Sequence, residues 1–100
     1  MFEARRMDHV TILRGEGELT RGELVAMAAV AARARREGRM VVVDLKAVTH
    51  LHYAGATLLA TIPGLRAAGA SRYVRDLVHA GGCGGVVEMF DDVEQAVRAA

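Results

Sequence analysis

Apolar and polar residues at the start of the chain follow a strand-like spacing. Residues 9–13 alternate with a period of two, which puts Val10 and Ile12 on one side and predicts a strand. Residues 15–17, Gly-Glu-Gly, predict a turn into a second short strand that ends at Leu19. We therefore expect the chain to begin with a β-hairpin.

A helix is predicted directly after this hairpin. Thr20 and Glu23 have the spacing of a capping box, in which the two side chains bond to free amides at the helix start. Apolar residues then recur at helix spacing, and Gly38 ends the pattern. They are Leu24, Met27, Ala28 and Ala31. So narrow a stripe indicates a helix that packs one face on a sheet.

Residues 41–60 carry the most informative pattern. Three valines followed by Asp44 and Leu45 predict a short strand buried on both faces, and a polar exit follows it. Gly55 then opens a helical stretch, which Pro63 interrupts either by a kink at Ile62 or by starting a new turn. The junction between strand and helix is therefore an exposed tip held between two anchored elements.

The last third of the chain predicts two further helices and one strand. Ser71 is a candidate cap for a helix with Tyr73, Val74, Leu77 and Val78 on one side, although a strand over residues 71–79 is the alternative. Residues 81–85 predict a glycine-rich loop. Val86–Phe90 predicts a strand, and Asp91 with Glu94 a capping box. The resulting order, β-β-α-β-α-α-β-α, is typical of an α/β fold in a single domain over residues 1–100.

Composition and charge narrow the classes of function. Thirteen basic and 12 acidic residues leave a net charge of +1, so no strong field attracts nucleic acid. The one basic cluster, Arg33, Arg35, Arg36 and Arg39, is interpreted as a solvated helix end rather than a phosphate site. A lone cysteine, Cys83, excludes an internal disulfide and indicates a reducing compartment. Without a signal-peptide pattern or a membrane-spanning run, we expect a cytoplasmic protein.

The sequence offers no set of residues with the spacing of a catalytic or metal site. Histidines 9, 50, 52 and 79 lack cysteine or carboxylate neighbours at ligand spacing, so no metal is predicted. The glycine run lacks the Lys-Ser/Thr ending of a phosphate-binding loop, and Asp44 has no second acid or base beside it. We expect a protein that is not an enzyme and that uses no cofactor.

Several segments together resemble a known family. They are residues 17–20, 41–45, 49–55, 74–77 and 90–97. In order and spacing these segments resemble a STAS domain, the fold of bacterial anti-sigma factor antagonists, over nearly the whole chain. The resemblance implies a mixed β-sheet packed against helices on one side, and a regulatory role in signal transduction and transcription through protein–protein interaction.

The chain departs from this family at the regulatory site. The family carries Asp-Ser-Ser-Gly there, and a kinase that doubles as an anti-sigma factor phosphorylates the first serine. Here His52-Tyr53-Ala54-Gly55 replaces it, Tyr53 lies at the position of the phosphorylated serine, and neither Thr49 nor Thr57 takes its place. The resemblance therefore implies a partner-binding surface without the serine switch. The residues expected there are His50, Leu51, His52, Tyr53, Ala54, Gly55 and Ala56.

A second departure concerns the strand that the family places between its second and third helices. Residues 65–70 run directly into the predicted helix at Ser71, so we expect that strand to be missing or reduced. Its loss would leave backbone groups unpaired. Val86–Phe90 would then pair with the Val41–Leu45 strand or with a second protomer in a homodimer.

The expected function is a regulatory module that binds a protein partner, either an anti-sigma factor or a related kinase-like protein. An alternative is a structural subunit or scaffold of a larger complex, such as a membrane lipid transporter or a signalling assembly. Neither involves direct contact with nucleic acid or insertion into a membrane.

Overall fold

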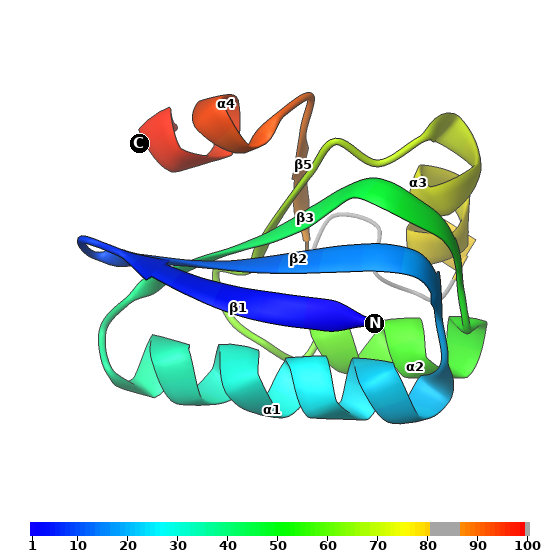
Figure 1. Ribbon diagram of the computed structural model, residues 1–100, viewed down its shortest axis with the longest axis horizontal. Helices are drawn as coiled ribbons and strands as arrows, with labels where there is room; N and C mark the ends of the chain where they lie inside the picture. Colours follow the sequence, from blue (N-terminus) through cyan, green and yellow to red (C-terminus); the bar gives the residue numbers. More distant parts are fainter. Residues whose placement is uncertain (81–86, 100) are drawn as a thin grey trace.

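The computed structural model describes residues 1–80 and 87–99, which form one five-stranded sheet with four helices (Figure 1). The strand order follows the sequence, from β1 to β5; β1 is antiparallel to β2, and every other neighbouring pair is parallel. The mixed α/β sheet predicted from the sequence is therefore confirmed. The strands are β1 Phe2–Met7, β2 Val10–Leu19, β3 Met40–Leu51, β4 Arg66–Ala68 and β5 Glu88–Phe90; the helices are α1 Arg21–Arg36, α2 Tyr53–Leu59, α3 Arg72–Val78 and α4 Val93–Arg98.

The hairpin lies one strand earlier than the sequence suggested. Its turn falls at Asp8, which has a φ of 51°, between β1 and β2, and β2 continues through the predicted turn. Gly15 is needed inside β2 because a Cβ there would come within 2.7 Å of the Val48 side chain on β3. Gly17, with a φ of 68°, lies at an irregularity in the pairing of β2 with β3. Gly15 therefore serves strand packing, and Gly17 supplies a left-handed backbone conformation inside the strand.

Strand β3 is the centre of the sheet, and its first half is buried on both faces as predicted. Val41, Val42 and Val43 are each 0% exposed. The strand is much longer than expected, because its second half pairs with Glu16–Leu19 of β2 and extends to Leu51. Asp44 therefore lies inside the strand, where its Oδ1 accepts a hydrogen bond from the Lys46 amide at 3.0 Å, and not at the junction.

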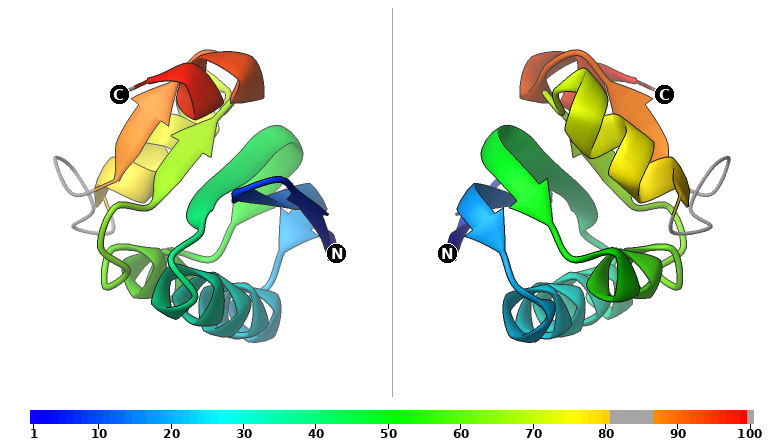
Figure 2. Two further views of the ribbon diagram at one scale, coloured as in Figure 1. Left: turned by 90° about the vertical axis from the view of Figure 1, so that its left-hand side faces the viewer. Right: turned by 90° about the vertical axis from the view of Figure 1, so that its right-hand side faces the viewer.

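Helices cover both faces of the sheet. Helices α1, α2 and α3 pack on one face, as expected, around a core that includes Leu24, Leu59 and Val74. Helix α4 lies on the opposite face, where Ala96 packs against Val42 (Figure 2). One-sided packing thus describes three of the four described helices, and α4 is the exception.

Helix α4 is fastened by a side chain from β4. The Arg66 guanidinium donates hydrogen bonds to the carbonyl oxygens of Ala96 and Ala99 at 2.6 and 2.7 Å. The same group lies 5.8 Å from the centre of the Phe90 ring. Because the last carbonyls of a helix have no partner inside it, Arg66 acts as a side-chain cap for α4.

The predicted caps at Thr20 and Ser71 are confirmed, but the Glu23 half of the capping box is not formed, because the Glu23 carboxylate pairs with the Met1 ammonium group. The Thr20 hydroxyl accepts from the Glu23 amide and the Ser71 hydroxyl from the Val74 amide, each at 3.2 Å. The strand alternative for residues 71–79 is therefore wrong. Helix α4 begins one residue later than predicted, because the Asp92 carboxylate, rather than that of Asp91, accepts from the helix, at the Gln95 amide.

Helix α2 ends at Leu59, before the proline. The Leu65 amide bonds to the Ile62 carbonyl across Pro63 and Gly64, and Gly64 has a φ of 72°. Proline at the second and glycine at the third position are typical of a type II turn. The second of the two predicted alternatives, a new turn at Pro63, is confirmed.

The strand that the sequence appeared to lack is present but reduced to three residues. β4 pairs with Val42–Asp44 of β3 on one side and with β5 on the other. The predicted direct pairing of Val86–Phe90 with the Val41–Leu45 strand is therefore wrong, since β4 lies between them. The predicted glycine-rich loop, its Cys83 and Val86 lie outside the described residues.

The basic cluster at the end of α1 is only partly the solvated helix end that was predicted. Arg33 and Arg36 are exposed. Arg35 donates to the Pro63 carbonyl at 3.0 Å. Arg39 donates to the Thr11 hydroxyl and to the carbonyls of Asp8 and Val10, at distances of 2.8, 2.8 and 2.6 Å. Arg39 therefore clamps the β1–β2 hairpin to the loop before β3.

We expect Arg39→Met to lower the free energy of unfolding by about 2 kcal/mol, because hydrogen bonds from a charged donor are lost while the aliphatic stem is kept. Urea denaturation measures the change. Arg36→Met removes the same charge from the exposed part of the cluster and should change stability by less than about 0.5 kcal/mol. Equal losses in the two variants would contradict the clamp.

Candidate partner-binding surface

The junction between β3 and α2 is organised by His52. Its backbone amide donates to the Leu19 carbonyl at 3.1 Å, and its Nδ1 accepts from the Ala54 amide at 3.2 Å. The imidazole thus caps α2, which begins at Tyr53, two residues before the predicted start at Gly55. The resemblance places an aspartate here, itself a favoured N-cap residue, so His52 keeps the capping role with a different side chain.

Tyr53 lies at the position that the resemblance gives to the phosphorylated serine of the family. It is 68% exposed, and its ring stacks on the His52 ring with centroids 5.2 Å apart and planes 13° from parallel. The structure therefore presents a flat aromatic side chain to solvent at the first position of α2.

A second aromatic pair lies two residues earlier on β3. His50 Nδ1 and the Tyr73 hydroxyl are 2.7 Å apart, and their rings stack at a centroid distance of 5.8 Å. The sequence pattern put Tyr73 on the packing side of its helix, but the structure leaves it 53% exposed, while Val74 and Val78 are buried. No signal in the sequence joined residue 73 to residue 50.

These residues define the aromatic surface: His50, His52, Tyr53, Ala54 and Tyr73. Both tyrosines of the chain lie in it, and each stacks on a histidine of the junction. Figure 1 shows the end of β3 descending between α3 and the start of α2, the three elements that carry it.

Three of the residues predicted for partner binding are buried. Leu51 and Ala56 are each 0% exposed and belong to the core beneath the junction, and Gly55 is also buried. They support the aromatic surface from below and are not available to a partner in this conformation. Of the flanking threonines, Thr49 is exposed on β3, and Thr57 donates its hydroxyl hydrogen bond to the Ala54 carbonyl at 2.8 Å.

Gly55 has a packing role that explains its presence at the junction. A Cβ at this position would come within 2.7 Å of Leu24 Cδ1 and 2.9 Å of Leu24 Cβ on α1. Real side chains essentially never approach this closely, so glycine is what allows α2 to lie against α1. This constraint is independent of any modification of the neighbouring residue.

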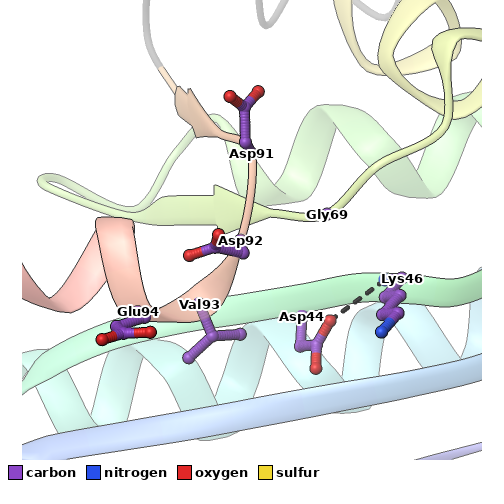
Figure 3. Close-up of a pocket in the computed structure, with 7 residues that line it drawn as sticks. All are labelled: Asp44, Lys46, Gly69, Asp91, Asp92, Val93 and Glu94. Atoms are coloured by element: carbon purple, nitrogen blue, oxygen red, sulfur yellow. Dashed lines mark hydrogen bonds between the residues drawn. The ribbon is translucent and has the colours of Figure 1, made fainter.

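An open depression lies elsewhere, on the face that carries α4 (Figure 3). It has a volume of about 620 Å³. Its lining comes from β3, from the segment after β4 and from the start of α4: Asp44, Lys46, Gly69, Asp91, Asp92, Val93 and Glu94. Asp44 and Asp92 already accept backbone hydrogen bonds there, and Glu94 pairs with Arg98, so three of its four carboxylates have partners within the chain.

Within residues 1–80 and 87–99, no group of three or more histidine, cysteine or acidic residues has the geometry to hold a metal ion. In the same residues, no helix is both long and apolar enough to cross a membrane.

No protein-family model and no curated protein sequence matches the chain. Solved structures do. An anti-sigma factor antagonist from Mycobacterium paratuberculosis superposes with a TM-score of 0.77 at 18% identity, covering 97% of this chain and 90% of the other. Unphosphorylated SpoIIAA, also an anti-sigma factor antagonist, gives 0.73 at 16% identity, with coverages of 97% and 93%. The phosphorylated form of the Bacillus cell-fate determinant SpoIIAA gives 0.68 at 17% identity, with coverages of 97% and 96%.

The chain has a STAS-like fold. Identities below 20% establish the architecture alone, since one fold hosts many functions. Within the STAS-like fold, the junction between β3 and α2 is the segment that the resemblance singled out. In the structure this junction carries an exposed aromatic surface.

We expect Gly55→Ala to lower the free energy of unfolding by about 1 kcal/mol, because overpacking against Leu24 outweighs the better helix propensity of alanine. Thermal or urea denaturation measures the change. Gly22→Ala in α1 is the matched control: its Cβ would meet only the Thr20 hydroxyl, at 4.0 Å. It should stabilise the protein by about 0.5 kcal/mol. A stabilising Gly55→Ala would refute the close approach.

Proposed function

We propose that this chain is a non-enzymatic regulatory module of the cytoplasm that binds a protein partner through the aromatic surface. The observation that carries the proposal is the exposure of Tyr53 and Tyr73 beside the junction, each stacked on a histidine. Tyrosine offers rigid, amphipathic contact area and is enriched among the residues that dominate binding energy. Stacking limits the ring motions that binding would otherwise have to restrict.

The fold and the site together support one class of partner. Two of the structures that share this fold are described as anti-sigma factor antagonists. We therefore propose a partner of the anti-sigma factor class. The aromatic surface lies at the position that the resemblance gives to the regulatory junction of those antagonists.

Regulation at this junction would differ from that of the family. SpoIIAA has been described in phosphorylated and unphosphorylated forms. This chain has Tyr53 at the position of the family serine, and a tyrosine hydroxyl lies several ångströms further from the backbone than a serine hydroxyl. A kinase site that positions an aliphatic hydroxyl would not reach the same geometry. We propose a module that binds without a serine phosphorylation switch.

We expect Tyr53→Ala to raise the Kd for the partner about tenfold or more, because it removes an exposed ring from the centre of the surface. The partner is first captured from an extract of the source cells with the intact protein and identified by mass spectrometry. Binding of purified variants is then measured by titration calorimetry. Val25→Ala, which trims another exposed apolar residue on α1, should leave the Kd unchanged.

Two outcomes would contradict the proposal. A folded Tyr53→Ala protein that binds as tightly as the wild type would exclude the aromatic surface as the binding site. A phosphate found by mass spectrometry on Tyr53, Thr49 or Thr57 of the captured protein would overturn the unswitched mechanism, whatever the affinity of the variants.

A further inference from the structure

Strand β1 forms an outer edge of the sheet, and among residues 1–80 and 87–99 one side of its backbone has no neighbouring strand. Within these residues β1 pairs only with β2, and five of its six residues are exposed. Edge strands offer rows of N–H and C=O groups to a further strand. The side chains of β1 decide whether a further strand can pair there.

The hydrogen bonding of β1 shows which backbone groups face outward. Met1 and Glu16 exchange hydrogen bonds, with the Glu16 amide 2.9 Å from the Met1 carbonyl. Because bonded and non-bonded pairs alternate in an antiparallel ladder, Glu3 and Arg5 also direct their backbone groups to β2. The N–H and C=O groups of Phe2, Ala4 and Arg6 therefore point to the open edge.

The side chains of β1 divide between the two faces of the sheet. Phe2 packs against the core beneath α1, so Ala4 and Arg6 share that face. Glu3 and Arg5 lie on the opposite face, where they line one shallow depression. Neither belongs to any of the ion pairs found in residues 1–80 and 87–99.

We propose that β1 pairs antiparallel with β1 of a second copy of this chain, about a two-fold axis through Ala4. In this register Phe2 faces Arg6 of the second copy and Ala4 faces Ala4. Every outward N–H and C=O of the three residues then has a partner, and the two sheets become one. Helix α1 packs over β2, β3 and α2, which leaves the β1 edge accessible.

The charges select this register. With Ala4 at the axis, Glu3 of each copy faces Arg5 of the other, at a non-hydrogen-bonded position where facing side chains approach most closely. Shifting the axis to Glu3 brings two glutamates together, and shifting it to Arg5 brings two arginines together. Charges on an edge usually oppose pairing. Here they oppose only the wrong registers.

The interface is a single pair of strands, so the dimer should be weak and dependent on concentration. Light scattering and sedimentation of the intact chain, from about 10 μM to about 1 mM, should show the mass rising from 10.7 kDa toward twice that value. Amide exchange should slow with concentration at Ala4 and Arg6 but not at Glu3 and Arg5. A mass that stays at one chain throughout would overturn the proposal.

Charge reversal tests the register itself. Glu3→Arg and Arg5→Glu should each weaken self-association about tenfold or more, because each places like charges opposite one another twice. The double variant Glu3→Arg/Arg5→Glu should restore it. A mixture of the two single variants should form heterodimers, because arginines on one copy then face glutamates on the other.

Glu88→Arg, the same charge reversal on strand β5 at the other edge of the sheet, is the matched control and should leave the dimer intact. Ala4→Pro removes an N–H that faces the open edge, which an edge strand tolerates, and should abolish the dimer in a folded protein. A dimer that survives Ala4→Pro and single charge reversal, or that is lost with Glu88→Arg, would exclude the β1 interface.

Discussion

The burial of β3 on both faces is the constraint from which the rest of the structure follows. A strand with Val41, Val42 and Val43 fully enclosed needs apolar cover above and below, and neighbours on both sides for its backbone groups. Helices α1, α2 and α3 supply one cover. The other face would be open without α4, and this explains why so short a helix is fastened by the Arg66 guanidinium at its C-terminal end. On the side of β3 opposite β2, the short strand β4 supplies the backbone pairing.

The position of the candidate surface follows from the same strand. β3 continues past its enclosed half to Leu51, paired with β2 as far as Leu19, so the chain leaves the sheet at a fixed place and direction. His52 then ends the strand and caps α2 in one residue. The close approach of Gly55 to Leu24 fixes the distance between α2 and α1. The segment that carries Tyr53 is thus held at three places: by the Leu19 carbonyl, by the cap at the Ala54 amide and by the packing of Gly55 on Leu24. This suits a residue proposed to bind.

Local patterns predicted the elements well where one signal dominated. The valine run, the caps at Thr20 and Ser71 and the turn at Pro63-Gly64 each depend on neighbouring residues, and each was confirmed. Strand β4 escaped because Arg66-Ala67-Ala68 has low strand propensity and is held in place by strands on both sides. The glycines of β2 were interpreted as a turn because the close approach of Gly15 to Val48, on another strand, leaves no local signal in the sequence. At α4, the predicted capping pattern of Asp91 with Glu94 overlaps the observed cap of Asp92 on the Gln95 amide, which starts one residue later.

The position of the candidate surface comes from the resemblance, whereas its composition comes from the structure. The resemblance located the junction, and the structure then separated its exposed residues from Leu51, Gly55 and Ala56, which are buried. Tyr73 could not have been included, since it reaches the junction only through the packing of α3 beside β3. Arg39 shows the same limit, because its hairpin partners lie about thirty residues away in sequence.

The three-residue ladders of β4 divide the molecule into parts of unequal resistance to opening. β1, β2 and the long β3 share extended ladders, whereas within the described residues the backbone pairing of β3 with β4 covers Val42–Asp44 alone, and β5 pairs with β4 over three residues. Local opening in proteins follows such differences in bonding. The aromatic surface spans this division, with Tyr53 on the firmly held side and Tyr73 on α3, between β4 and β5. The contact between His50 and Tyr73 then joins the two parts. A partner that covers both tyrosines would keep this contact formed. Its binding would therefore also lower the population of locally open molecules.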